Sequence, residues 1–185
     1  MFQLLILKIK CLLFIIFFSI SSHVSKATDL NKLFFDLKNA KNETIAKQIE
    51  TKIWQNWISG GSSKLSNQKM LEGIDLLNYG HLDKAYFIFK DLSKIEPKWA
   101  ETYNKLATIK YLQRDYRSSI YYINLTLKLE PRHFGAISGL AQINLSLDEF
   151  DEALKNINYV LKIHPYIGIK KLKPLLLKKL NKKET

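Results

Sequence analysis

The sequence has little cysteine, proline, glycine or arginine. Its only cysteine is Cys11, so the chain beyond that point can form no disulfide, no thiolate nucleophile and no cysteine-based metal site. Hydrophobic residues make up 46% and charged residues 25%, which is ordinary globular usage and argues against wholesale disorder or a polytopic membrane protein. A length of 185 residues fits one domain, or a domain plus a targeting segment, and excludes a large multidomain enzyme.

Motifs for catalysis are also missing. There is no glycine-rich phosphate loop, no His-Glu-x-x-His and no serine-hydrolase motif. The four histidines, His23, His81, His133 and His164, are not at metal-ligand spacing. We therefore expect no enzyme activity, no cofactor and no metal.

Residues 1–27 have the pattern of a secretory signal. Lys8 and Lys10 precede about 10 apolar residues, and the small residues Ser25 and Ala27 stand where signal peptidase requires them. Cleavage after Ala27 is expected, and it would remove Cys11. The alternative, an uncleaved anchor, needs about 20 continuous apolar residues, a length that the two lysines interrupt.

Three prolines reveal an internal repeat. Pro97, Pro131 and Pro165 are 34 residues apart, and units that start at positions 66, 100 and 134 align residue by residue. Small residues recur at position 8 and position 20 of the unit, and large apolar residues recur at positions 17, 24 and 30. The small set is Gly73, Ala107, Ala141, Ala85, Ser119 and Ala153; the large set is Leu82, Tyr116, Phe150, Phe89, Ile123, Ile157, Ile95, Leu129 and Ile163.

This pattern predicts an all-α chain of helix hairpins. Small residues at positions 8 and 20 would let the two helices of each unit cross closely. The large residues at positions 17, 24 and 30 are expected on the inner face of the second helix. Each proline would end one unit, because it cannot continue the helix before it but suits the first turn of the next.

The units resemble tetratricopeptide repeats. The resemblance rests on Gly80-His-Leu-Asp-Lys-Ala85, Asp115-Tyr-Arg-Ser-Ser119 and Glu149-Phe-Asp-Glu-Ala153, which match the family's turn and second helix. It implies a right-handed superhelical solenoid with repeats at 66–99, 100–133 and 134–165. Residues 130–140 also resemble a segment of exported tetratricopeptide proteins of alphaproteobacteria, which together with the signal implies the periplasm of a Gram-negative bacterium.

Segments on either side complete the expected organisation. Residues 28–58 show two amphipathic stripes and are interpreted as an N-terminal helical hairpin. The Gly/Ser stretch within 59–65 has the most flexible composition, so it is expected to be a joint. Residues 166–185 are rich in lysine and leucine, which favours a basic capping helix for the last repeat.

The resemblance also implies a binding site. Members of the family hold an extended peptide or a partner helix in a groove lined by positions 2, 5, 9 and 12 of each first helix. Amide side chains there can pair with a bound main chain, although apolar members such as Ile74 are equally expected to pack between hairpins. The predicted groove residues are Asn67, Met70, Ile74, Glu101, Asn104, Thr108, Tyr111, Ser138 and Gln142, with Leu77, Gly135 and Leu145 at the remaining positions.

A second expected contact is the repeat junction Arg132-His133-Phe134, interpreted as an unusual exposed sequence. The net charge of +12 does not identify the partner, because the repeats are nearly neutral and the excess lies in residues 1–27 and 166–185. The leading hypothesis is a periplasmic adapter or assembly scaffold without catalysis. The alternative is a membrane-surface protein whose residues 170–183 contact anionic lipid; nucleic acid is not expected, since the groove has few arginines and no aromatic ladder.

Overall fold

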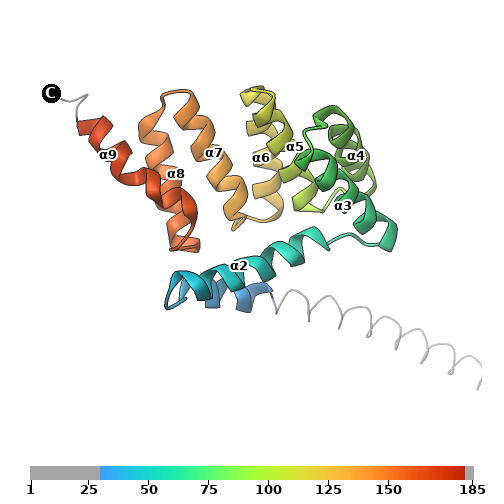
Figure 1. Ribbon diagram of the computed structural model, residues 1–185, viewed down its shortest axis with the longest axis horizontal. Helices are drawn as coiled ribbons and strands as arrows, with labels where there is room; N and C mark the ends of the chain where they lie inside the picture. The colour runs from blue at the N-terminus through green and yellow to red at the C-terminus, as the bar shows by residue number, and fades with distance from the viewer. Residues whose placement is uncertain (1–29, 182–185) are drawn as a thin grey trace, which may run out of the picture.

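The computed structural model describes residues 30–181 and folds them into helices without a strand in that range (Figure 1). The predicted signal segment and residues 182–185 lie outside the described residues. A first helix spans residues 30–38. The others are α2 (Glu43–Ile58), α3 (Lys64–Asn78), α4 (Leu82–Ile95), α5 (Ala100–Leu112), α6 (Tyr116–Leu129), α7 (Phe134–Ser146), α8 (Phe150–Ile163), the short 3₁₀ helix η1 (Gly168–Leu172) and α9 (Lys173–Asn181).

Helices α3 to α8 form three successive hairpins, as the repeat pattern predicts. Within each hairpin the small residues of positions 8 and 20 are buried, so the two helices cross closely. In the second hairpin Ser119 Oγ donates a hydrogen bond of 2.8 Å to the carbonyl oxygen of Ala107. A hydroxyl is therefore tolerated at position 20, because the backbone carbonyl of the facing position 8 accepts its hydrogen bond.

One packing expectation is wrong. In the first two units position 30 is not on the inner face, because Ile95 is 59% and Leu129 is 39% exposed; Ile163 of the third unit is partly buried against the apolar cluster. Position 27 is buried instead. Positions 17, 20, 24 and 27 of the unit lie on one stripe of the second helix at helical spacing, and position 30 lies outside this stripe. Position 27 is occupied by Leu92, Thr126 and Val160, all fully buried.

The turn of each hairpin contains one residue with a left-handed backbone. These residues are Gly80, Arg114 and Asp148, with φ of 77°, 59° and 58°, and all three stand at position 15 of their unit. A shared positive φ lets the chain reverse in the same way three times. Glycine adopts this conformation freely, whereas arginine is strained there.

Helix α3 ends the solenoid on its N-terminal side. The face that α5 and α7 turn toward the preceding hairpin is mostly apolar and buried, but the same face of α3 is polar and exposed. A polar outer face is what a terminal repeat needs in water. Gln68, Glu72 and Asp75 of α3 stand where α5 has Thr102, Leu106 and Ile109.

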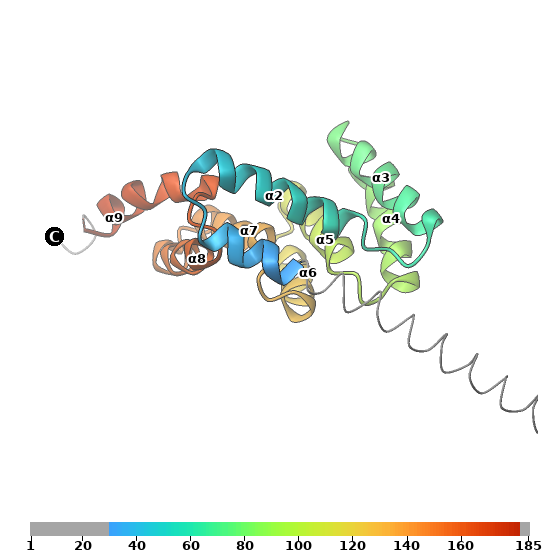
Figure 2. The same ribbon diagram turned by 90° about the horizontal axis from the view of Figure 1, so that it is seen from below.

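The N-terminal helices do not stack on that end. Instead α2 runs along the row of hairpins, across the starts of α5 and α7 (Figures 1 and 2). The carbonyl oxygen of Trp57 accepts a 2.6 Å hydrogen bond from Trp99 Nε1, Trp57 stacks on His133, and Glu50 Oε2 lies 3.5 Å from His164 Nε2. Helix α2 thus follows successive repeat junctions.

The Gly/Ser segment between α2 and α3 is anchored, contrary to the expectation of a free joint. Glu96 Oε1 accepts hydrogen bonds from the backbone N–H of Ser62 at 3.0 Å and from its hydroxyl at 2.6 Å. A side chain at Gly60 or Gly61 would collide with Trp99. The two glycines are needed because the backbone passes close to the indole of Trp99. Flexibility is not the reason for them.

After α8 the chain covers the last hairpin. Ile169 of η1 and Leu176 of α9 are buried, and both belong to the same apolar cluster as Ile157 of α8. Packing of this kind closes the apolar face that a solenoid would otherwise leave open. Among residues 30–181, no helix has the length and apolar character needed to cross a membrane.

Candidate functional site

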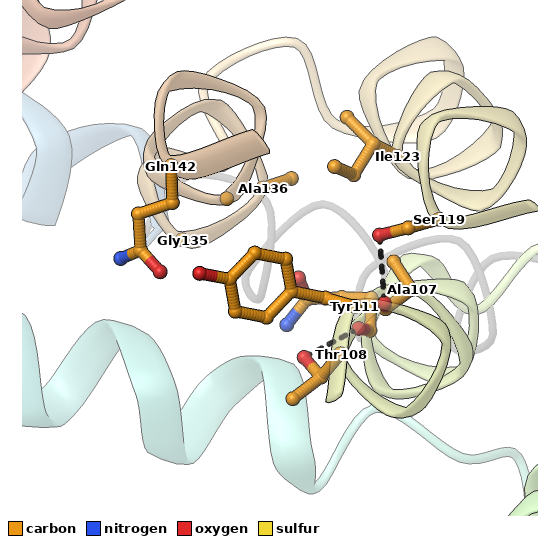
Figure 3. A pocket seen from close by; sticks show the side chains of 10 residues that line it. Ala107, Thr108, Tyr111, Ser119, Ile123, Gly135, Ala136 and Gln142 are labelled. Atoms are coloured by element: carbon orange, nitrogen blue, oxygen red, sulfur yellow. Dashed lines mark hydrogen bonds between the residues drawn. The ribbon is translucent and has the colours of Figure 1, made fainter. Parts of the chain in front are cut away.

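A pocket of about 230 Å³ lies between the first helices α5 and α7, and Ser119 and Ile123 of α6 form another side of it (Figure 3). Four of its lining residues are among the nine predicted groove residues, and Gly135 stands at one of the remaining groove positions. Tyr111 lies between α5 and α7, directed toward the side of Gln142, and Thr108 lies beside it on α5. The four are Asn104, Thr108, Tyr111 and Gln142.

The other predicted groove residues do not join them, Gly135 excepted. Met70 and Glu101 are fully buried, so neither can touch a partner on the surface. Asn67, in the first turn of α3, is held to the segment before that helix, because its Oδ1 accepts the N–H of Gly61 at 3.0 Å. Ile74, Leu77 and Leu145 are partly buried against the apolar clusters, and Ser138 is half-buried outside the pocket.

Sequence reasoning missed the small and apolar wall of the pocket. Ala107, Ala136 and Gly139 make that wall together with Ile123 of α6. The available signal was Gly139, a glycine in a helix interior where the other two copies have Leu71 and Lys105. A glycine costs helix stability there, which usually indicates a packing or functional reason.

The polar groups of the pocket differ in how they are held. Thr108 Oγ1 donates to the backbone oxygen of Asn104 at 2.9 Å, and Asn104 Nδ2 donates to Glu101 Oε2 at 3.2 Å. Within residues 30–181, no hydrogen bond engages the Tyr111 hydroxyl, the Gln142 side-chain amide or the Asn104 amide oxygen. These three groups are free to bind a ligand.

A buried charged cluster lies behind Asn104. His133 Nε2 is 2.9 Å from Glu101 Oε2, and Lys105 Nζ is 2.9 Å from Glu101 Oε1. His133 Nδ1 accepts the N–H of Ala136 at 3.1 Å, so Nε2 carries the proton and donates a hydrogen bond to the carboxylate. Burial raises the pKa of Glu101, but the His133 hydrogen bond and the Lys105 charge outweigh it, so the pKa is lowered and the carboxyl stays ionised.

The junction Arg132-His133-Phe134 is not the exposed contact that the sequence suggested. His133 is completely buried and Phe134 is 1% exposed, because the aromatic side chains of α2 cover both. Arg132 is held by the carboxylate of Glu130, at 2.9 Å from Nε, and its guanidinium lies over Phe34. This junction binds the chain's own N-terminal helices and is unavailable to a partner.

Helix α2 also limits the groove beside the pocket. Trp54 lies against the backbone of Gly135, where an added Cβ would be 2.6 Å from Trp54 Cη2. Lys105 Nζ lies 5.6 Å from the centroid of the same ring. The starts of α5 and α7 are thereby covered, and the part that stays open is the pocket and the surface beyond it.

No group of three or more potential metal-ligating side chains occurs in the described residues.

Comparison with known proteins agrees with this architecture. No family model matches the chain. A TPR repeat-containing protein of Rhizobium etli is 31% identical over 137 residues, which cover 74% of this chain and 66% of that protein. The chain is a tetratricopeptide-repeat protein.

Solved structures show the same fold. A mutant of MamA superposes with a TM-score of 0.52 at 13% identity, covering 88% of this tetratricopeptide-repeat chain and 92% of MamA. Another MamA structure gives a TM-score of 0.51 at 17% identity, covering 84% and 90%. These likenesses concern the fold alone. A tetratricopeptide fold is consistent with a protein interaction module, and the family generally binds proteins and is generally non-catalytic.

Proposed function

We propose that this protein is an exported, non-catalytic adapter or assembly scaffold that binds a segment of a partner protein at the pocket between α5 and α7. The observation that carries the proposal is the set of unpaired hydrogen-bonding groups on Asn104, Tyr111 and Gln142, three residues from two repeats that line the same pocket. Amide and hydroxyl groups pair with the main chain of a bound segment through donors and acceptors together.

Export rests on the signal pattern of residues 1–27. The relevant compartment is then the periplasm, where the mature chain from Thr28 works without cysteine. Fractionation of cells that produce the full chain tests this part: a periplasmic form shorter by about 27 residues is expected, whereas a full-length cytoplasmic form would contradict export.

Crosslinking tests the binding site. A photoreactive amino acid at Gln142, which is exposed at the rim of the pocket, is expected to capture a defined partner band in living cells. The matched control is the same amino acid at Asn124, which is exposed on the second helix α6. Equal patterns from both positions would show that the pocket is not the binding site.

The lysine-rich C-terminal helix supplies a second candidate function. Leu175 and Leu177 are exposed beside Lys178 and Lys179, although Leu176 is buried in the cap. A basic helix with exposed leucines associates with anionic lipid. Replacing Lys171, Lys178 and Lys179 by Gln should abolish sedimentation with phosphatidylglycerol vesicles and leave folding intact; unchanged sedimentation would reject membrane contact.

A further inference from the structure

The pocket is the size of one side chain. At about 230 Å³ it is smaller than most small-molecule sites, which span about 300–1,000 Å³. It is larger than a cavity of about 150 Å³, which holds a benzene ring. A leucine, methionine or phenylalanine side chain therefore fits.

One glycine keeps the pocket open. Gly139 stands in the interior of α7, and a Cβ there would meet only Ile123 Cδ1, at 3.6 Å, which is an ordinary contact. Nothing in the packing of the hairpin therefore requires a glycine at this position. What glycine provides is open space, bounded by Ala107, Ala136 and Ile123, on the side that faces the groove.

The lining carries no charged residue. A charged side chain that entered the pocket would lose water and find no counter-ion there, which is costly. The nearest buried carboxylate, Glu101, is already occupied by His133, Lys105 and Asn104. The chemistry of the wall thus selects an uncharged, apolar occupant.

The rim adds an oriented acceptor. Because Glu101 is an acceptor only, it must be the nitrogen of the Asn104 amide that faces it, and the amide oxygen is left for another partner. A backbone N–H of a bound segment is the complementary group. Burial of Glu101 beneath α2 keeps this orientation fixed.

We propose that the pocket takes a single bulky apolar side chain of an extended, locally uncharged protein segment, and that a backbone N–H of this segment donates to the Asn104 amide oxygen. The inference rests on the proposed binding function and specifies its ligand. Gly139 sets the size of the accepted side chain, and Glu101 acts as a positioning residue for Asn104.

A random peptide library displayed on phage, selected against the mature chain, is the probe. The selected peptides should share one Leu, Met or Phe flanked by uncharged residues. Gly139→Leu, which fills the pocket, should weaken their binding by about tenfold or more, whereas Gly139→Ala should retain it. Thermal unfolding of both variants verifies that each is folded.

Different failures have different meanings. If no peptide is selected, the binding function itself is wrong. If peptides are selected but bind Gly139→Leu as tightly as the natural chain, or share a charged anchor, the groove binds peptides but the pocket assignment is overturned.

Peptides N-methylated at one backbone position at a time test the acceptor without altering the protein. Loss of about tenfold in affinity at a single position near the apolar anchor is expected. The same scan on Asn104→Leu should show no such position. A flat scan on the natural chain would overturn the role of Asn104.

Discussion

The imidazole of His133 lies parallel to the indole of Trp57, with ring centroids 3.9 Å apart and an interplanar angle of 10°. His133 is the N-cap of α7, directly before the third repeat, and Trp57 lies in the last turn of α2, so this stack joins residues 76 positions apart in the sequence. Phe134 and Trp54 pack edge-on beside it. The contact makes the N-terminal helices part of the core of the solenoid.

Replacing Trp57 should test how much this contact contributes. Trp57→Ala is expected to lower the free energy of unfolding by about 3–5 kcal/mol, because it removes the indole from a packed aromatic cluster. Trp57→Phe should cost much less, since Trp57 Nε1 is buried without a hydrogen-bond partner and the ring of Phe keeps most of the packing. Urea denaturation gives both values.

Phe35→Ala is the matched control, because this side chain is 68% exposed on the neighbouring helix 30–38. It should change stability by no more than about 0.5 kcal/mol. If Trp57→Ala were equally mild, the N-terminal helices would not be held to the repeats by this cluster.

The repeat architecture could be predicted from the sequence, whereas the position of the N-terminal hairpin could not. Prolines at a constant interval and small residues at two fixed positions describe contacts inside each hairpin, which are local. The stripe of Trp54 and Trp57 shows that α2 buries one face but does not say against what, because His133 and Phe134 are distant in sequence. Gln68, Glu72 and Asp75 did carry a signal: their polarity indicates that no hairpin stacks on α3.

The candidate site likewise has residues that the sequence could predict and residues that it could not. Tyr111 and Gln142 could be predicted because the repeat register places them on the first helices. Glu101 shares that register but is buried, since α2 covers the starts of α5 and α7. The position in the repeat predicts toward which side a side chain points. It does not predict whether another segment of the chain covers that side.

Two glycines of α7 should respond in opposite ways to alanine. At Gly135 a Cβ would be 2.6 Å from Trp54 Cη2, and that indole is held by its hydrogen bond of 3.2 Å to Glu50 Oε1. Gly135→Ala is therefore expected to destabilise the fold by about 1–3 kcal/mol. Gly139→Ala has room and should gain up to about 1 kcal/mol from helix propensity. Equal effects in urea denaturation would show that Trp54 does not constrain Gly135.

The hairpin turns offer a second matched pair. Gly80→Ala places a Cβ at φ 77° and should cost about 1–2 kcal/mol, although nothing crowds that position. Arg114→Gly relieves the same conformation in the next repeat and should raise stability by up to about 1 kcal/mol, the gain being reduced by the entropy of glycine. Thermal unfolding measures both. A destabilised Arg114→Gly variant would mean that side-chain contacts of Arg114 outweigh its backbone strain.

Glu50 should make the attachment of α2 sensitive to acid. The imidazole of His164, whose Nε2 lies 3.5 Å from Glu50 Oε2, lowers the pKa of Glu50 from 4.5 to about 2; burial opposes this shift, and Lys47 and Trp54 support it. Because the folded pKa lies below the unfolded one, Glu50 stabilises the fold fully above pH 4.5 and loses that contribution as the pH falls toward 2. The difference in unfolding free energy between the natural chain and Glu50→Gln should therefore shrink over this interval.

Glu72→Gln, at an exposed position of α3, is the control and should give a small difference that does not change with pH in this way. A Glu50→Gln difference that stays constant from pH 4.5 to pH 2 would show that the carboxylate does not contribute to holding α2 against His164.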